Sequence, residues 1–441
     1  MKRHVMMAAL WLVAPSIAWG QTLEECLAIA RARAPKIRVA EASVSRAEEA
    51  VREARAALSP TLRLGASFVQ SSEPPRTVFS LPGVAGPQAI KIGSASVLDV
   101  RTDAQFPLYT GGRSRALVRA AESAREGQVQ AKEQAAADLT LRVSRAFYRT
   151  LAARRLEAAA SEALASARAH RGTSAARVRA GVVPRLDSLQ AQVDMASRSS
   201  ALVRAQEAVR MTRIELETEI GAPLDSSRTL VEPGPPAPLP DAVASIARAL
   251  RSRPELAAAD DALRENAWRL EAARAGRKPQ VNLTGTAQYL GPNRDEDYWN
   301  VRDPGLKTYR LFAGIGLTMP LVDGGLVRAR VGEVAADRSA LAARRADVAL
   351  TVRREVEQAL SDARVAFTVW QSDSSRVSAA REALRTAAAG YKGGTATGTD
   401  VRDAESGLAD ARAEEAESLM DYWIARASLD RAAGVVPQGG D

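Results

Sequence analysis

Two carboxylates near the C-terminal end of the chain are spaced so that they could act together. Asp400 and Asp403 lie in GGTATGTDVRDAE (393–405), and residues three apart share one face of a helix. Paired carboxylates on one face attract cations. The same residues could instead serve only the helix, with Asp400 capping it and Asp403 in its first turn, where the helix dipole favours a negative charge. Both roles can hold together, and both stay open at this point.

Groups that catalyse reactions or hold metals are scarce. After residue 20, His170 is the only histidine and Cys26 the only cysteine, so we expect neither a histidine–cysteine zinc site nor a Ser-His-Asp triad. The glycines at 390–398 lack the lysine-hydroxyl ending of a phosphate-binding loop. We therefore expect no enzyme, no metal site and no cofactor, so that energy for any transport must come from a partner.

The composition favours long helices. Aromatic residues make up 4% of the chain and charged residues 26%, while alanine carries much of the apolar content. The net charge is +9, and the Lys and Arg residues that produce it alternate with Glu and Asp along the expected helices. A nucleic-acid binder concentrates such charge among aromatics, so we expect no nucleic-acid partner.

The first 20 residues have the pattern of a signal peptide. MKRH is a basic n-region, VMMAALWLVAPSIA is an apolar h-region, and AWG before Gln21 is a small-residue cleavage site. The mature protein is then expected to start at Gln21, outside the cytoplasm. LEEC lacks the small-residue pattern of a lipoprotein signal, so we expect Cys26 to be a buried hydrophobe that is not lipidated.

The mature chain contains an internal duplication of one structural unit. Pro35 aligns with Pro254, 219 residues later, and Gly181 aligns with Gly394, 213 residues later, so one loop differs by six residues. The first repeat is expected over 21–231 and the second over 242–441. EPGPPAPLPD (232–241) between them is rich in proline and predicts an extended connector.

The sequence of each repeat predicts two helices, two strands and a long helical hairpin. The strands are expected at about 61–70, 97–107, 280–290 and 309–320, because apolar and polar residues alternate there over lengths typical of tilted membrane strands. A soluble sheet with one buried face would alternate in the same way. FPLYTGGRSRA (106–116) and MPLVDGGLVRA (319–329) then predict a strand end, a glycine turn and a helix start.

The hairpins are longer than a globular domain needs. The helices after the glycine turns run to about Ala180 and Ala389, and each measures about 100 Å at 1.5 Å per residue. Their tips are expected near 181–187 and 393–403. Four strands cannot close a barrel in lipid, where open edges leave backbone groups unpaired, so several copies must share one barrel. The number of copies does not follow from the sequence.

The doubled order of helices and strands, the signal peptide and the two Pro-x-x-x-Gly-Gly turns resemble the TolC-like outer-membrane efflux protein family. The resemblance covers the whole mature chain. It implies a mainly α fold, with a periplasmic α-barrel and four β-strands per protomer in a twelve-stranded barrel shared by a homotrimer. It also implies contact with outer-membrane lipid, a periplasmic adaptor and an inner-membrane transporter.

The resemblance also assigns roles to residues at the two tips. Asp400 and Asp403 match positions where the family places acidic rings at the periplasmic entrance. Asp187 and Tyr391 match a pair whose cross-helix hydrogen bond helps to hold that entrance closed.

Two further tip features bear on the partners and on the gate. Gly181 and Gly394 match tip glycines that adaptor hairpins approach, although both glycines could simply end helices. The family often has a basic gate residue where this chain has Ala396, and Arg185 is not an obvious substitute. How the gate is held closed is therefore not predicted.

We thus expect a passive exit duct of a tripartite export system, with small-molecule or drug efflux preferred over the outer-membrane role in type I protein secretion. A hypothesis from another class is a secreted coiled-coil scaffold or adhesin without a pore. That hypothesis accounts for the alanine-rich helices but not for four amphipathic strands in two matching pairs.

Overall fold

The protein is described by a computed structural model over residues 20–73, 76–79, 86, 88–91, 95–225, 228–291 and 309–435. The expected signal peptide lies outside the described residues except for Gly20. The chain forms two compact units. We call Met1–Ala42, Gln130–Leu256 and Asp347–Asp441 the helical unit, and Ser43–Val129 with Ala257–Ala346 the sheet unit.

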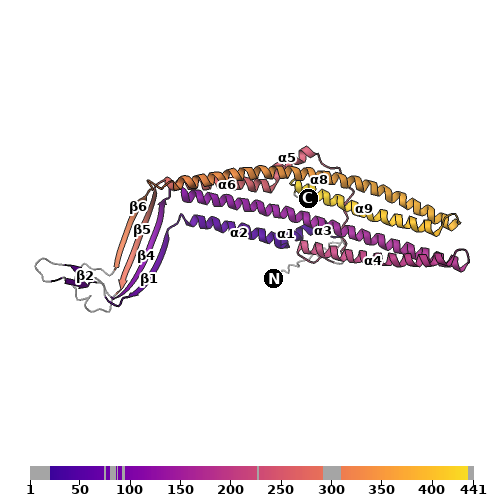
Figure 1. The fold of residues 1–441 in the computed structure, drawn as a ribbon, viewed down its shortest axis with the longest axis horizontal. Coiled ribbons are helices and arrows are strands. Elements are labelled where there is room, and N and C mark those ends of the chain that lie inside the picture. Colours follow the sequence, from indigo (N-terminus) through magenta and orange to yellow (C-terminus); the bar gives the residue numbers. More distant parts are fainter. Residues whose placement is uncertain are drawn as a thin grey trace, which may run out of the picture. The chain divides into compact units, whose positions relative to one another are not determined.

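Helices make up most of the described chain (Figure 1). Their bounds are α1 (Leu23–Arg33), α2 (Pro35–Ala56), α3 (Arg113–Arg179), α4 (Arg185–Ile220), α5 (Ala242–Ser252), α6 (Pro254–Arg274), η1 (Ala275–Arg277), α8 (Leu326–Gly393) and α9 (Gly398–Ala432). No described helix combines the length and the apolarity needed to cross a membrane.

The two repeats begin their first helices by the same local device. The hydroxyl of Thr22 accepts a hydrogen bond from the Glu25 amide at 3.2 Å, and the Asp241 carboxylate accepts one from the Ala244 amide at 2.9 Å. Each cap satisfies an amide that the first helical turn would otherwise leave unpaired. Pro35 and Pro254 then start the next helix of each repeat, where a missing amide costs nothing.

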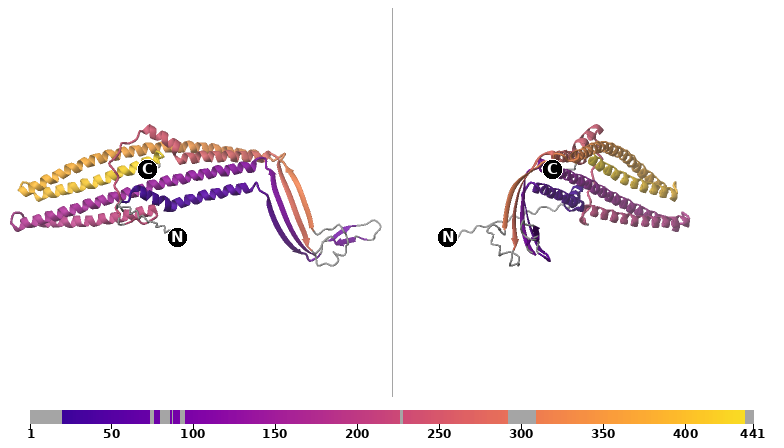
Figure 2. Two further views of the ribbon diagram at one scale, coloured as in Figure 1. Left: turned by 180° about the vertical axis from the view of Figure 1, so that it is seen from behind. Right: turned by 60° about the vertical axis from the view of Figure 1, so that its left-hand side comes forward.

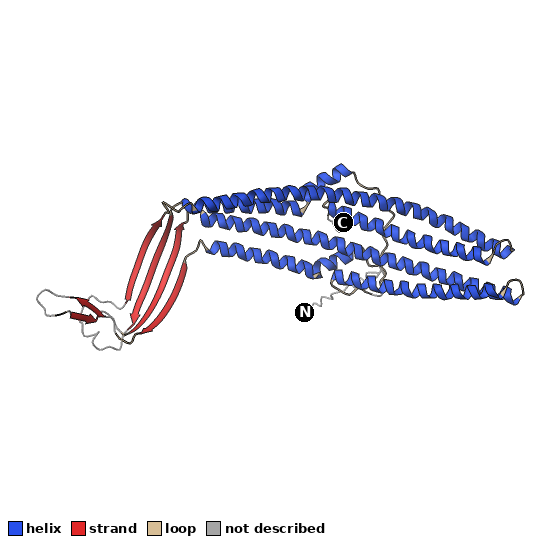
Figure 3. Ribbon diagram, viewed as in Figure 1, coloured by secondary structure: helices blue, strands red, loops and turns tan. Residues whose placement is uncertain are grey.

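The sheet unit holds four antiparallel strands in the order β1-β4-β5-β6, which form a single layer (Figures 2 and 3). They are β1 (Thr61–Gln70), β4 (Ser96–Tyr109), β5 (Gln280–Gly291) and β6 (Tyr309–Thr318). The register places apolar residues opposite one another across all four strands: Phe68 faces Leu98, Phe106 faces Leu283, and Leu283 faces Ile315. One face of the sheet is therefore apolar.

This apolar face is uncovered in the single chain. Leu64 is 74% exposed and Leu311 is 79% exposed, and the described residues of both edge strands are exposed on both faces. The opposite face is polar, where Thr286 and Gln288 donate hydrogen bonds to Asp103 and Asp99. A soluble sheet buries its apolar face, so this sheet has the reverse of the usual arrangement.

One further, two-stranded sheet lies between β1 and β4 in the chain. Residues Arg76–Phe79 (β2) and Gln88–Lys91 (β3) pair as a two-stranded antiparallel hairpin. Each strand has four residues, too few for the alternation that marked the longer strands. Residues 292–308, between β5 and β6, lie outside the described residues.

In the helical unit the duplication extends to the core. Equivalent positions of the two repeats are buried in the same way. The pairs are Ala30 and Ala249, Ile37 and Leu256, Leu139 and Val352, Val143 and Val356, Phe147 and Leu360, and Leu216 and Leu429. Each repeat thus packs its short helices on its own hairpin.

The connector between the repeats is extended and lies along α9. The buried hydroxyl of Tyr422 donates to the carbonyl of Ala237 at 2.6 Å, and Arg155 of α3 pairs with Glu232 at 2.5 Å. These contacts satisfy connector groups that proline-rich backbone cannot satisfy by itself.

We predict that Gly221→Ala destabilises the helical unit more than Gly181→Ala does. Both glycines have φ of 73°, which costs a residue with a Cβ about 1–2 kcal/mol. A Cβ at Gly221 would also lie 3.2 Å from the Arg33 carbonyl oxygen, whereas none of the described atoms lies within 4 Å of one at Gly181. Denaturant midpoints measured by circular dichroism check this order, and equal midpoints would contradict the contact with Arg33.

Candidate functional site at the hairpin tips

The two long hairpins of the helical unit end in turns built alike (Figure 1). Gly181 and Gly394 follow α3 and α8 with φ of 73° and 79°. The Val182 amide donates a hydrogen bond to the Arg177 carbonyl at 3.0 Å, and the Thr395 amide donates one to the Gly390 carbonyl at 2.9 Å. These are the bonds of a Schellman helix ending, which favours glycine in the left-handed position. A Cβ at either glycine would meet no described atom within 4 Å, so both tips are open to a partner.

Asp400 belongs to a capping box at the start of α9. Its carboxylate accepts hydrogen bonds from the Thr397 amide at 2.7 Å and the Thr397 hydroxyl at 2.8 Å, and the hydroxyl accepts the Asp400 amide at 3.2 Å. Thr397 is thus the N-cap, and Asp400 occupies the third helical position. The prediction that Asp400 itself caps the helix placed it three residues too early in the helix. Asp403 lies one turn further, and both carboxylates are exposed.

These hydrogen bonds favour the charged form of Asp400. The Thr397 amide lowers the pKa of the Asp400 carboxyl, and the Thr397 hydroxyl lowers it further. Because the carboxylate is exposed while capping the helix, capping and attraction of cations do not compete. The two roles considered for Asp400 are compatible in this geometry.

Asp187 and Tyr391 come together at the tips. Asp187 lies in the first turn of α4 and Tyr391 in the last turn of α8. Both border Gly398, where an added Cβ would lie 3.3 Å from Asp187 Oδ2 and 3.8 Å from Tyr391 Cε2. The Tyr391 hydroxyl is nevertheless buried without a hydrogen-bond partner among the described residues. The pair is adjacent here, but its expected hydrogen bond is not formed.

Two residues of α3 to which the sequence assigned no role, Arg177 and His170, lie against Tyr391, and a third, Ser174, lies beside His170. The guanidinium of Arg177 lies 4.3 Å from the centroid of the Tyr391 ring and donates to the Tyr391 carbonyl at 3.1 Å. The His170 ring lies 5.6 Å from the Tyr391 ring, and Ser174 is buried beside His170. Residues 170, 174 and 177 share one helical face, which is the signal that could have identified them.

Polar contacts continue along α3 and α9 behind the tips. The hydroxyl of Ser166 donates to Glu405 at 2.7 Å, and Arg412 pairs with Glu162. Both contacts line a cavity of about 230 Å³ among α3, α4, α8 and α9. Near the tips these polar groups link the second hairpin to the first, and further along α9 Leu419 and Met420 join the apolar core of the first repeat.

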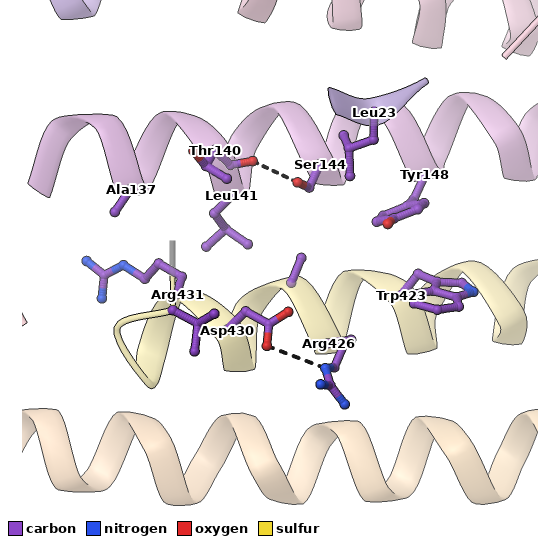
Figure 4. A pocket seen from close by; sticks show the side chains of 12 residues that line it. Leu23, Ala137, Thr140, Leu141, Ser144, Tyr148, Trp423, Arg426, Asp430 and Arg431 are labelled. Atoms are coloured by element: carbon purple, nitrogen blue, oxygen red, sulfur yellow. Dashed lines mark hydrogen bonds and ion pairs between the residues drawn. The ribbon is translucent and has the colours of Figure 1, made fainter. Parts of the chain in front are cut away.

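A second cavity of the helical unit, of about 160 Å³, lies between α1, α3 and α9. Figure 4 shows Tyr148 and Trp423 at one end of it and Arg431 at the other. Burial raises the pKa of Asp430, and Arg426 at 3.4 Å opposes this effect. Asp430 and Arg431 already have ionic partners, so this cavity is a packing gap rather than a candidate binding site.

We predict that Tyr391→Phe leaves the stability of the protein unchanged or raises it, because the hydroxyl has no partner to lose. Tyr391→Ala should cost about 3–5 kcal/mol, since it removes a buried ring. Denaturant midpoints of the two variants and the wild type measure the difference. Destabilisation by Tyr391→Phe would mean that the hydroxyl is bonded, with Asp187 the nearest expected acceptor.

We also predict that Thr397→Ala raises the pKa of the Asp400 carboxyl. In the native protein this pKa is lowered, so the contribution of Asp400 to stability is present above its unfolded-state pKa and is lost as the pH falls through the lowered value. Carbonyl ¹³C titration of labelled aspartate, with Asp400→Asn for assignment, measures the change. An unshifted titration in Thr397→Ala would contradict the capping box.

A family model described as outer membrane efflux protein matches residues 27–222 and 245–435, one match in each repeat. No curated protein matches the chain significantly. Solved structures match nearly all of it.

The outer-membrane channel OprN has a TM-score of 0.73 at 22% identity, over 93% of this chain and 89% of that chain. The outer membrane protein VceC from Vibrio cholerae has a TM-score of 0.73 at 20% identity, over 93% of this chain and 96% of that chain. The open state of the MtrE channel of Neisseria gonorrhoeae has a TM-score of 0.72 at 22% identity, over 93% and 88%. These matches confirm the mainly helical, internally duplicated fold. The chain belongs to the outer membrane efflux protein family and has a TolC-like fold.

Proposed function

We propose that this protein is the outer-membrane exit duct of a tripartite export system. It would conduct substrates passively from a periplasmic adaptor and an inner-membrane transporter to the exterior. The observation that carries the proposal is the four-stranded sheet. Its apolar face is uncovered, and the outer edges of β1 and β6 have no partner strand within the described chain.

Lipid is the partner that suits such a face. Side chains such as Leu64, Leu311 and Ile315 are more than two-thirds exposed in the single chain, and burying them in a bilayer is favourable at about 25 cal/mol per Å². The free edges of β1 and β6 must still be paired, because unpaired backbone groups cost several kcal/mol each in hydrocarbon. Three copies, the number that the family implies, would pair the edges and form a twelve-stranded barrel.

The tips of the helical unit are the proposed periplasmic entrance. Asp400 and Asp403 are exposed there, and a homotrimer would gather six carboxylates that attract cations. We assign Asp187 and Tyr391 to the gate, since they already share the space around Gly398. Gly181 and Gly394 leave open space at the tips for an adaptor hairpin.

Neither catalysis nor lipidation is part of this proposal. Cys26 is wholly buried in the core of the first repeat, and burial raises the pKa of its thiol to about 11. A buried, protonated thiol is a poor nucleophile and a poor site for acylation. The protein would be held in the outer membrane by its sheet.

Small-molecule efflux is the preferred transport role, and the outer-membrane role in type I protein secretion is the alternative. A scaffold or adhesin without a pore is the alternative of another class, and the exposed apolar sheet argues against it. High salt should release a scaffold from membranes, whereas a barrel requires detergent.

We predict that the detergent-extracted protein forms cation-preferring channels in a planar bilayer, and that Asp400→Asn/Asp403→Asn lowers this preference. The asparagine side chains keep the size of the carboxylates but not their charge. Asp421→Asn, an exposed change further along α9, is the matched control and should behave as the wild type.

Three other results would change the assignment. Channels whose selectivity is the same in the double variant would keep the duct but restrict both aspartates to helix capping. An equal loss in the Asp421→Asn control would point to a general charge effect. Release of the wild type by salt, without any channel, would favour the scaffold.

A further inference from the structure

One side chain of the first hairpin makes two different contacts with the tip of the second. The guanidinium of Arg177, in the last turn of α3, lies 4.3 Å from the centroid of the Tyr391 ring. The Nη1 atom of the same guanidinium donates a hydrogen bond to the Tyr391 carbonyl at 3.1 Å. Tyr391 lies in the last turn of α8, so Arg177 links the ends of the two longest helices.

The two contacts are favourable for separate reasons. A guanidinium over an aromatic face is attracted by the negative charge of the ring face, more strongly where water is excluded, and Tyr391 is 5% exposed. The Tyr391 carbonyl belongs to the last turn of α8, at the negative end of the helix dipole, where a basic group is stabilising. A charged donor also makes a stronger hydrogen bond to this carbonyl than a neutral donor would.

Arg177 is not engaged by any acidic side chain that the structure describes. Its printed neighbour in function is Tyr391 alone, through the ring and the carbonyl. Arg385 of α8 shows the usual alternative, since it pairs with Glu382 on its own helix at 2.6 Å. Arg179, two residues after Arg177, donates only to the Ala175 carbonyl of its own helix, at 3.4 Å. Contact with the other hairpin thus distinguishes Arg177 from nearby arginines.

The Tyr391 hydroxyl does not contribute to holding the tip. It is buried without a hydrogen-bond partner among the described residues. The ring is instead contacted from α3 on one face of that helix, by Arg177 and by His170, whose ring lies 5.6 Å away. Tyr391 is therefore fixed through its ring and its carbonyl.

We propose that Arg177 is a positioning residue of the gate, which holds the tip of the second hairpin against the first and so keeps the periplasmic entrance closed. The inference rests on the proposed function, in which Tyr391 belongs to the gate. Parting the tips would break the ring contact and the carbonyl bond together. The basic group of the gate then comes from α3, whereas the second tip has Ala396 where the family often has a basic residue.

Bilayer recordings of the detergent-extracted protein test this role. Arg177→Met keeps an unbranched side chain but removes the charge and the donors. We expect it to raise the open probability about tenfold or more, because one charge-assisted hydrogen bond and one cation–π contact are lost. Arg177→Lys keeps the charge but not the planar fork, so it should be intermediate. Arg179→Met, the matched control, removes the same charge and should behave as the wild type.

Variants of Tyr391 separate the ring from the hydroxyl. Tyr391→Phe keeps the ring and the carbonyl, so its open probability should equal that of the wild type. Tyr391→Leu removes the ring and should open the entrance. Arg177→Met should then have a smaller effect in the Tyr391→Leu background than in the wild type, since the two residues share one contact.

Hydrogen exchange provides a readout that needs no channel. In the detergent-purified protein, amides in the last turn of α8 should exchange about tenfold faster in Arg177→Met than in Arg179→Met, because local opening becomes easier. Global denaturant midpoints of the two variants should agree. This combination separates a gate residue from one that supports the whole fold.

Several results would overturn the proposal. Wild-type open probability in Arg177→Met would overturn the role of Arg177 and keep the duct. Equal increases in Arg177→Met and Arg179→Met would reduce the effect to general charge. Opening by Tyr391→Phe would assign the closed state to the hydroxyl. An absence of channels from every preparation, with the difference in hydrogen exchange intact, would overturn the duct but keep the contact that holds the tips together.

Discussion

The helical unit depends on an ion-pair network around two arginines, Arg253, which is buried, and Arg431, which is partly buried. Arg253 lies between α5 and α6, is 4% exposed, and bonds to Glu255 and to Glu355 of α8. Arg431 of α9 reaches the same two carboxylates and also Asp138 of α3. Buried charges cost several kcal/mol each unless they are paired, so these helices must keep their present arrangement for the network to remain complete. The network therefore ties the second repeat to the first.

The duplication shows which position of the first repeat corresponds to the centre of this ion-pair network. Arg253 occupies the position that Ala34 holds in the first repeat, where the same junction between two short helices is apolar and packs against Ile220 and its neighbours. The first repeat thus has the larger apolar core, and the second repeat relies more on ion pairs. Two copies of one sequence have diverged in chemistry while they keep the same buried positions, because packing restricts volume more strictly than it restricts polarity.

Two kinds of surface carry the proposed functions. The hairpin tips are polar, and the carboxylates of Asp400 and Asp403 remain in solvent while a capping box closes the start of α9. The sheet has the opposite character, with an apolar face that a single chain leaves uncovered. The proposed exit duct must contact both water and lipid, so it needs both surfaces.

The sequence alone determined the duplication, the strand positions, the long hairpins and the glycine turns, because each rests on local periodicity or on one residue's backbone angles. The capping box could also be predicted from the sequence, since Thr397 and Asp400 are three residues apart. Only the tertiary structure decided which distant residues meet: Asp187 and Tyr391 around Gly398, and His170 and Arg177 against the Tyr391 ring. Periodicity shows which face of a helix is apolar, whereas the partner of that face depends on packing between segments hundreds of residues apart.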